Sequence, residues 1–396
     1  MFLRRQYKYF NTQIIKRNIN ILSLEYSCDD SCVSILTEKG DILFNKKITS
    51  SHVSEAGGVI PIKAIIHHQK TLPLLVQTAL KETKLTIGKE INMICATRGP
   101  GLAGSLCTGY QFSKGLAVAH PNVKFIGVHH MLGHLLISTL EFPELLEKPF
   151  LSLLVSGGHT QLVLTEDVLT HDILVDLKEK SAIGDSLDKC GRLLGFKGEM
   201  IAKEMESFIQ KQNLPLNDSD YYKKLTKTDF PFKFPLNAAS NNSDVAFSFS
   251  GQITQLKQYL DKQNIIIKNL SSKKKAEIAY QVQYLHFYHL IKKIKQLYTI
   301  RPELNDYPLV LSGGVAANMF LRQFFKKEIN STIYFPERKD LCTDNSVMIG
   351  WAGLLFNKKS NLLTKMDSTT QSKWPLNELI SIGGYEEDST LIKKSL

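Results

Sequence analysis

The sequence lacks the features of several protein classes. It has no stretch of about 18 consecutive apolar residues, which is the length that a membrane-spanning helix needs, so we expect no membrane partner. Its six cysteines are dispersed along 396 residues and most lie in apolar stretches, which favours buried thiols in a reducing compartment over a disulfide framework. With 43% hydrophobic and 22% charged residues, the composition is that of a globular protein and excludes wholesale disorder.

Acidic residues are absent from the first 20 positions. This segment carries Arg4, Arg5, Lys8, Lys16 and Arg17 among apolar side chains, and it is poor in serine. A cationic, acid-free N-terminus is typical of a mitochondrial presequence, although a solvated basic tail has the same composition. We therefore predict a targeting segment over 1–20 and a mitochondrial matrix location. These five charges leave +6 of the net +11 for the rest of the chain, which is compatible with RNA as a partner, although many proteins this basic bind no polyanion.

The length of the chain and an internal repeat both predict two lobes. A single hydrophobic core stops growing at about 250–300 residues, and this chain is longer. An apolar strand, a tight turn and a second strand occur at 21–36 and again, 129 residues later, at 150–165. Two unrelated hairpins could look alike by chance, but strands that alternate with helical stretches indicate an α/β fold.

We therefore predict a duplicated fold with a central cleft. The expected N-terminal lobe covers 21–145 and the C-terminal lobe covers 146–356, and 357–396 is a candidate segment for completing the first lobe. The polar stretch at about 197–250 is expected to be an irregular insertion.

Three glycine-bearing turns follow predicted strands, at 98–104, 156–160 and 312–318. Glycine allows positive φ and close backbone approach, so successive N–H groups can converge on a phosphate. Each turn alone could simply reverse the chain, but together they favour a nucleotide cleft. The Walker pattern and the dinucleotide-binding fingerprint are both missing, which excludes those two kinds of phosphate loop.

A second candidate site begins with His130 and His134. Residues four apart project from one face of a helix, so their imidazoles could share a metal ion, or they could be a pair of hydrogen-bonded structural histidines. A zinc protease of the HExxH type would have glutamate where Met131 stands, which argues against peptide hydrolysis. Asp344 is the natural third ligand, and helix capping is the competing role for it.

The remaining candidates are acidic residues in turns. Asp29 and Asp30 follow the first strand, and Asp185 and Asp188 lie near the middle of the chain. Turns favour aspartate for structural reasons, so a catalytic role for these residues is supported only if the duplicated hairpins face one another across a cleft.

Taken together, these motifs resemble the TsaD-like family of tRNA threonylcarbamoyladenosine transferases. The resemblance runs in order through about residues 21–356, and the leader suggests the mitochondrial branch. The residues that carry it are Leu22–Cys32, His52, Gly57–Pro61, Gly99–Leu102, His130–His134, Leu154–Thr160, Phe247–Gly251, Gly313–Asn318 and Cys342–Asn345.

The resemblance implies a two-lobe ATPase fold, like that of actin and the heat-shock ATPases, and a specific reaction. The family transfers threonylcarbamoyl from threonylcarbamoyl-AMP to the N6 amine of adenosine 37 in tRNAs that read ANN codons, and releases AMP. A separate synthase would supply the adenylate, and two copies of the chain would form a homodimer.

By motif match, one divalent ion, zinc or iron, would be held by His130, His134 and Asp344. Asp29 or Asp30 would accept the amine proton. The adenylate would be bound by Leu154, Val155, Ser156, Gly157, Gly158, Asp188, Gly198 and Asn318.

The sequence departs from the family pattern in several places, which keeps other functions open. The family's Glu-Thr-Ser-Cys-Asp-Glu-Thr segment is here Glu25-Tyr26-Ser27-Cys28-Asp29-Asp30-Ser31, and Asp185 replaces a usual glutamate. Where the family has Pro-Glu-Leu-Ala-Ser-Arg this chain has Pro61–Ile66, Leu132 replaces a common glutamate, and a Pro-Gly-Gly segment has no clear counterpart near Gly198. The alternatives are an ATP-dependent kinase or ATPase of the same fold and a nucleotide-binding partner protein without activity.

Overall fold

The computed structural model describes residues 19–50, 59–179, 181–198, 200–214, 219–227 and 245–389. The predicted targeting segment therefore lies outside the described residues up to position 18, as do His52 and Gly57–Gly58 of the family pattern. Among the described residues, no helix combines the length and the apolar character needed to span a bilayer.

The first of two five-stranded sheets has the order β3-β2-β1-β4-β5. Its β1, β2 and β3 form an antiparallel meander, and β4 and β5 run parallel to β1. The strands cover Asn20–Glu25, Asp30–Thr37, Ile42–Thr49, Ile91–Gly99 and Lys124–His129.

The second sheet repeats this arrangement, with β8-β7-β6-β9-β10 in the corresponding order. Here β6, β7 and β8 form the meander, and β9 and β10 run parallel to β6. The strands cover Phe150–Val155, Thr160–Thr165, His171–Val175, Leu309–Ser312 and Ile333–Tyr334.

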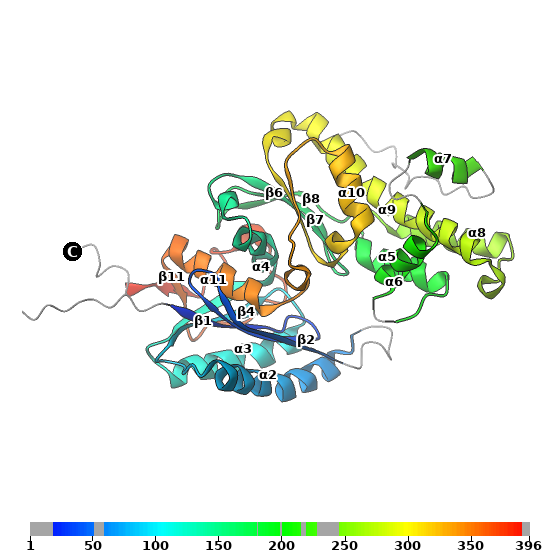
Figure 1. Ribbon diagram of the computed structural model, residues 1–396. Helices are drawn as coiled ribbons and strands as arrows, with labels where there is room; N and C mark the ends of the chain where they lie inside the picture. The colour runs from blue at the N-terminus through cyan, green and yellow to red at the C-terminus, as the bar shows by residue number, and fades with distance from the viewer. Residues whose placement is uncertain are drawn as a thin grey trace, which may run out of the picture.

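The strand register repeats with the same spacing as the sequence. Leu22 pairs with Ile35 in the first hairpin, and Leu151 pairs with Leu164 in the second, so both partners are displaced by 129 residues. The predicted α/β architecture with a duplicated two-lobe core is therefore confirmed, and the two sheets are visible in Figure 1.

Helices cover both faces of the first sheet because side chains of its strands alternate between them. Leu22 and Leu24 pack with α2 (Pro61–Thr83) and α3 (Ala103–Ala119), whereas Ile21 packs with α11 (Ser346–Ser360) on the opposite face. In Figure 1, α2 and α3 lie below this sheet and α11 lies above it.

The second lobe has its own core of buried side chains from its sheet and from the long helix α9. Helix α9 covers Ser272–Ile300. The other helices of this lobe are α5 (Ile183–Leu193), α6 (Ile201–Lys211), α7 (Ser219–Lys227), α8 (Ser250–Lys262) and α10 (Met319–Glu328).

The prediction that 197–250 is irregular is wrong where the structure describes it. Both α6 and α7 fall in this stretch. Met205 and Ile209 of α6 are buried in the core of the second lobe, and Tyr222 of α7 stacks on Tyr284 at 4.2 Å between ring centroids. A helix that buries only one face has mostly polar residues, so the composition of this stretch did not indicate helices.

Two helices join the lobes. The short helix α4 (His130–Leu136) contacts α11 and strands of both sheets, and one buried cluster contains Ile21 of the first sheet together with Leu154 and Val310 of the second. Although α11 lies within the expected second lobe, it packs against the first sheet, so the expected boundary at 356 does not follow the packing.

The C-terminal segment also packs on the first lobe. Its β11 (Leu362–Thr364) pairs with β12 (Tyr385–Glu387), and the Arg98 guanidinium donates hydrogen bonds to the carbonyls of Thr369 and Gly383. Short 3-10 helices occur at Ile137–Leu140, Pro143–Leu146, Ile267–Asn269, Pro302–Asp306, Gly314–Ala317, Lys339–Leu341 and Leu376–Glu378.

Candidate functional site

The paired histidines lie on α4, directly after the end of β5. The His129 side chain caps this helix, because its Nδ1 accepts a hydrogen bond from the backbone N–H of Met131 at 3.1 Å. His130 and His134 are then one helical turn apart, and their ring centroids are separated by 4.8 Å. Both residues are buried, so the predicted helix presents both imidazoles from one face.

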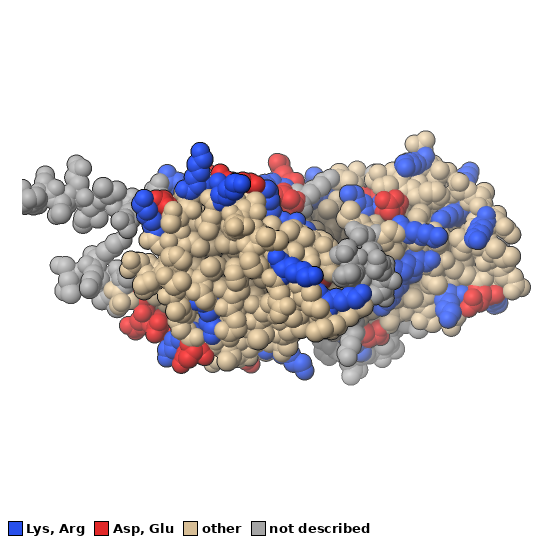
Figure 2. Space-filling view, turned by 90° about the horizontal axis from the view of Figure 1, so that it is seen from below, with Lys and Arg blue, Asp and Glu red and all other residues tan. Residues whose placement is uncertain are grey.

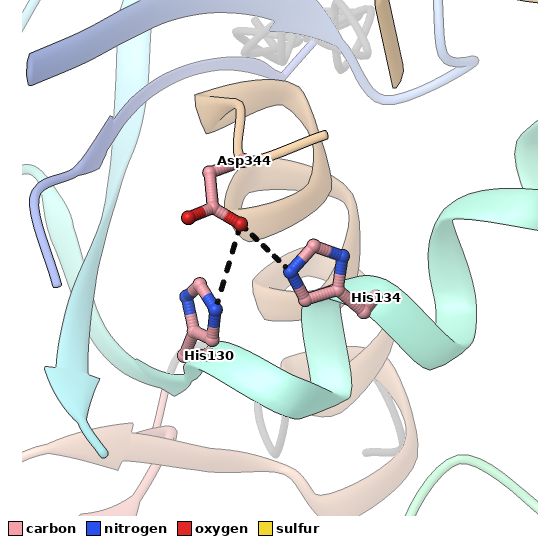
Figure 3. A group of neighbouring side chains, drawn as sticks. All are labelled: His130, His134 and Asp344. Atoms are coloured by element: carbon pink, nitrogen blue, oxygen red, sulfur yellow. Dashed lines mark hydrogen bonds and ion pairs between the residues drawn. The ribbon is translucent and has the colours of Figure 1, made fainter. Parts of the chain in front are cut away.

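Asp344 reaches the histidines from the loop before α11. Its Oδ1 lies 3.0 Å from His134 Nε2 and 3.8 Å from His130 Nε2, as Figure 3 shows. One donor atom from each residue lies within 4.8 Å of the others. The structure therefore brings together all three residues predicted to hold a metal.

The competing capping role for Asp344 is wrong, because Asn345 caps α11 instead. The Asn345 side-chain oxygen accepts a hydrogen bond from the Met348 N–H at 2.9 Å. The Asp344 carboxylate is therefore committed to the two imidazoles and not to the backbone of the helix.

The opposite charges of the histidines and carboxylates at this site stabilise one another and shift their pKa values. Burial raises the pKa of the Asp344 carboxyl, but its hydrogen bond from His134 and the charge of His130 outweigh that effect and hold the pKa below its ordinary value. Burial likewise lowers the pKa of His130, yet the carboxylates of Glu25 and Asp344 raise it to about 9. A cation is thus favoured between these groups, whether it is a proton or a metal ion.

The donor set fits a divalent transition metal. Two imidazole nitrogens and one carboxylate oxygen are the ligands of many zinc sites and of the non-haem iron sites that keep open positions. Neutral imidazole nitrogens and an ionised carboxylate are also the protonation states that such an ion binds. These residues are therefore suited to hold zinc or iron.

A residue that sequence reasoning gave no role lies behind His130. Glu25, at the end of β1, is buried, and its Oε2 lies 3.1 Å from His130 Nδ1. The Ser27 hydroxyl lies 3.2 Å from the same nitrogen. The signal that could have found Glu25 is its place at the start of the Glu-Tyr-Ser-Cys-Asp turn, immediately after a buried strand.

Asp29 lies in the turn after β1, near the same site, and Asp30 is the first residue of β2. Asp30 pairs with Lys47 on β3 at 2.9 Å, while Asp29 is half-buried and burial, with the charges of Asp30 and Asp344, raises its pKa. The turn is held by His68, whose Nε2 lies 3.0 Å from the Cys28 carbonyl. The catalytic role of either aspartate stays a prediction.

The predicted phosphate turn opens into free space. The Ser156 hydroxyl accepts hydrogen bonds from the N–H groups of Gly158 and His159, at 3.3 and 2.9 Å, which folds the turn tightly. A Cβ atom added to Gly157 or Gly158 would meet no atom within 4 Å. These two glycines are therefore exposed, and their backbone can be approached by a ligand.

A second glycine turn lies beside the first, because β6 and β9 are neighbouring parallel strands with Leu154 opposite Ser312. Gly313 has φ of +94°, and a Cβ atom there would lie 2.4 Å from the Val155 carbonyl oxygen. Only glycine permits this approach. The turns predicted at 156–160 and 312–318 are therefore adjacent at the carboxyl ends of their strands.

Helix α5 begins against the Ser-Gly-Gly turn. The Gly184 N–H donates to the Ser156 carbonyl at 3.1 Å, and a Cβ atom on Gly184 would lie 2.7 Å from that oxygen. The positive end of the α5 dipole therefore lies next to the turn, an arrangement that favours bound anions.

Two of the other residues predicted to bind the adenylate form hydrogen bonds within the protein. Asp188 Oδ1 accepts a hydrogen bond from the Ala202 N–H at 2.8 Å, in the first turn of α6. The Asn318 side chain caps α10 through the Leu321 N–H at 3.1 Å and donates to Gln283 at 3.2 Å. Gly198 is exposed with φ of +118°. Their adenylate contacts stay predictions, as do those of Leu154 and Val155, which are buried in β6.

Comparison with known proteins agrees with this geometry. The family model described as tRNA N6-adenosine threonylcarbamoyltransferase matches residues 41–351. A mitochondrial tRNA N6-adenosine threonylcarbamoyltransferase from Schizosaccharomyces pombe is 33% identical over 390 residues, which cover 93% of this chain and 89% of the relative. A tRNA N6-adenosine threonylcarbamoyltransferase from Thermus thermophilus is 33% identical over 369 residues, with 91% of this chain and 99% of the relative covered.

Among solved structures, HypF from T. kodakarensis superposes with a TM-score of 0.51 at 12% sequence identity. The match covers 87% of this chain and 48% of that chain, so it shows a shared fold and nothing about activity. The family model spans most of the chain, and the curated relatives match over nearly their whole length. The chain belongs to the tRNA N6-adenosine threonylcarbamoyltransferase family.

Proposed function

We propose that this protein transfers threonylcarbamoyl from threonylcarbamoyl-AMP to the N6 amine of adenosine 37 in mitochondrial tRNAs that read ANN codons. The observation that carries the proposal is the convergence of His130, His134 and Asp344 next to the Ser-Gly-Gly turn in a chain of this family. The ring of His159, which directly follows that turn, lies 6.4 Å from the ring of His130. The products are the threonylcarbamoylated nucleoside and AMP.

The chemistry demands an activated carbonyl and a stabilised leaving group, because the N6 amine of adenosine is a poor nucleophile. A zinc or iron ion held by His130, His134 and Asp344 would act as a Lewis acid toward substrate oxygens. The amide of the exposed Gly157, with the N-terminus of α5, would bind the phosphate of the adenylate and stabilise the charge that departs with AMP.

The amine must also lose a proton during the transfer. Asp29 and Asp30 are the candidates, since Asp29 lies in the turn that follows Glu25 and Asp30 begins the next strand. Asp29 is a half-buried carboxyl with a raised pKa. A raised pKa makes a carboxylate a better proton acceptor near neutral pH. We expect Asp29→Asn to lower the transfer rate more than Asp30→Asn, because Asp30 already pairs with Lys47.

The test is a transfer assay with the purified protein, loaded in turn with zinc and with iron. Threonylcarbamoyl-AMP and unmodified tRNA are the substrates, and nucleoside analysis at position 37 is the readout. Absence of the modified nucleoside with both metals would overturn the proposal. The same protein given threonine, bicarbonate, ATP and tRNA should form no product unless a threonylcarbamoyl-AMP synthase is added.

The assay also separates the two alternatives. A kinase or ATPase of this fold would consume ATP in the absence of the adenylate, which we do not expect. A nucleotide-binding partner without activity would complement cells that lack the modification equally well with Asp344→Ala. We expect that variant to fail, because it removes the carboxylate shared by both imidazoles.

We propose a mitochondrial matrix location on the basis of the cationic N-terminus and of the mitochondrial relative. Residues 1–30 fused to a fluorescent reporter should direct it to mitochondria. A variant of the fusion with Arg4, Arg5, Lys8, Lys16 and Arg17 replaced by glutamine should stay in the cytosol. A cytosolic signal from the unaltered fusion would contradict the proposal.

We also propose that two copies associate through the face formed by α2 and α3. Figure 2 shows few charged side chains over a broad part of this face. Ile62, Ile66 and Leu74 of α2 and Val118 of α3 are exposed on the helices that form it, and self-association would bury such side chains. Sedimentation should give a dimer for the wild type and a monomer for Ile66→Glu, and a monomeric wild type would refute the interface.

A further inference from the structure

We propose that Glu25 is a positioning residue, which orients the His130 ring so that Nε2 faces the metal. The inference rests on the proposed metal site and adds to it a residue that does not touch the ion. Glu25 would act through the hydrogen bond between its carboxylate and His130 Nδ1.

The two nitrogens of His130 face different carboxylates. Nδ1 lies 3.1 Å from Glu25 Oε2, and Nε2 lies 3.8 Å from Asp344 Oδ1, next to His134. An imidazole that donates its Nδ1–H to a carboxylate keeps the Nε2 lone pair for a metal. Such an outer carboxylate fixes the tautomer and the ring orientation, and it also makes the ligand more basic.

Glu25 itself is held rigidly by its neighbours. Its Oε1 accepts a hydrogen bond from the Ser27 N–H at 2.6 Å, and its Oε2 accepts one from the Thr97 hydroxyl at 2.5 Å. The side chain is 2% exposed and extends from the end of β1, which pairs with β4 beside it. The carboxylate therefore has little freedom to move away from His130.

Burying this carboxylate is costly unless it serves a charged partner. Three groups contact it, the Ser27 N–H, the Thr97 hydroxyl and the His130 imidazole, and of these the imidazole is the one that can carry a charge. Ser27 and Thr97 would be served as well by a neutral acceptor. The ion-pair partner that the structure gives Glu25 is His130.

The experiment measures Zn²⁺ affinity, using the purified full chain and competition with a chelator. We expect Glu25→Gln to weaken Zn²⁺ binding by about 10–100-fold, the usual cost of losing such a partner. Thr97→Val is the matched control, because it removes another hydrogen bond to the same Oε2 and leaves the contact with His130 in place. It should bind Zn²⁺ nearly as tightly as the wild type.

A second readout separates positioning from a general structural role. In protein labelled with ¹⁵N-histidine, the Zn²⁺-loaded wild type should show His130 protonated at Nδ1 and bound through Nε2. Glu25→Gln should lose this single state, and the His130 signals are assigned by their absence in His130→Ala. If Glu25→Gln does not fold, Glu25→Asp, which withdraws the carboxylate by one methylene, takes its place in both measurements.

Wild-type Zn²⁺ affinity in the Glu25 variant would overturn the proposal, and so would an equal loss in Thr97→Val. Binding of His130 through Nδ1 would overturn it as well. None of these measurements uses tRNA or the adenylate, so a failed transfer assay with intact Zn²⁺ binding would count against the proposed reaction and not against the role of Glu25.

Discussion

Individual side chains at the junction of the two lobes hold the candidate metal site. His130 and His134 come from a helix of seven residues, and Asp344 comes from a loop more than 200 residues later. Each supplies one donor atom, so the site loses a ligand whenever one of them is replaced.

We predict that His130→Ala and His134→Ala each strip the bound metal. Two remaining ligands hold a divalent ion weakly, because such sites depend on at least three protein donors. Metal content per chain after gel filtration, measured by mass spectrometry, is the readout. His67→Ala on α2 is the control and should keep its metal, while unchanged stoichiometry in both site variants would refute the ligand assignment.

Asp188 offers a second prediction at this scale. Its carboxylate accepts the Ala202 N–H at the start of α6, so Asp188→Ala should lower the free energy of unfolding by about 1 kcal/mol, as loss of a helix-capping acceptor does. Urea denaturation measures the change. Lys189→Ala removes a half-exposed ion pair with Asp185 and should cost less, and equal effects would contradict the capping role.

Among the elements, α3 is shaped by one close contact with the first sheet. A Cβ atom on Gly109 would lie 2.3–2.4 Å from the ring of Tyr26, which is fully buried beneath the helix. Because Gly109 has no side chain, the Tyr26 ring fits against the helix at this position.

Gly109→Ala should lower the free energy of unfolding by about 1–3 kcal/mol, because the new methyl overlaps a ring that has no room to move. Gly115→Ala on the same helix is the matched control. No atom lies within 4 Å of its added Cβ, so that variant should gain about 0.5–1 kcal/mol from better helix propensity. Thermal unfolding of both variants would reveal the opposite signs, and equal shifts would show that Tyr26 can move aside.

On the scale of the whole molecule, acid should weaken the fold through its buried histidines. Burial lowers the pKa of His286 to about 4 and that of His289 to about 3. The unfolded chain binds a proton at each below its ordinary pKa of about 6.5, and the folded chain does not. Stability therefore falls as the pH drops from about 6.5 toward 4, by up to about 1.4 kcal/mol per pH unit for each histidine.

His289→Gln provides the check. His289 Nε2 accepts the Ser248 N–H at 3.1 Å, and the glutamine oxygen can accept the same bond without titrating. The variant should lose less free energy of unfolding than the wild type between pH 7 and pH 5, measured by urea denaturation of the metal-free protein. Identical losses would show that His289 is not neutral in the folded chain.

The sequence alone determined whatever depends on local pattern. The repeat at a spacing of 129 residues predicted two equivalent sheets, because the residues that form a strand–turn–strand unit are adjacent in the sequence. The pairing of His130 with His134 followed from helical periodicity, and the glycine turns followed from the dihedral freedom of glycine. Polar helices such as α6 were missed, since a helix that buries one narrow face has few apolar residues to reveal it.

Tertiary structure decided what depends on contacts between distant segments. It gave the capping role to Asn345 and left Asp344 to the imidazoles, because only the position of α11 beside α4 sets which side chain reaches them. In the tertiary structure α11 packs on the first sheet, and Glu25 contacts His130, which is 105 residues away in the sequence. Spacing along the chain cannot reveal such pairs, since packing of the two lobes alone brings them within hydrogen-bonding distance.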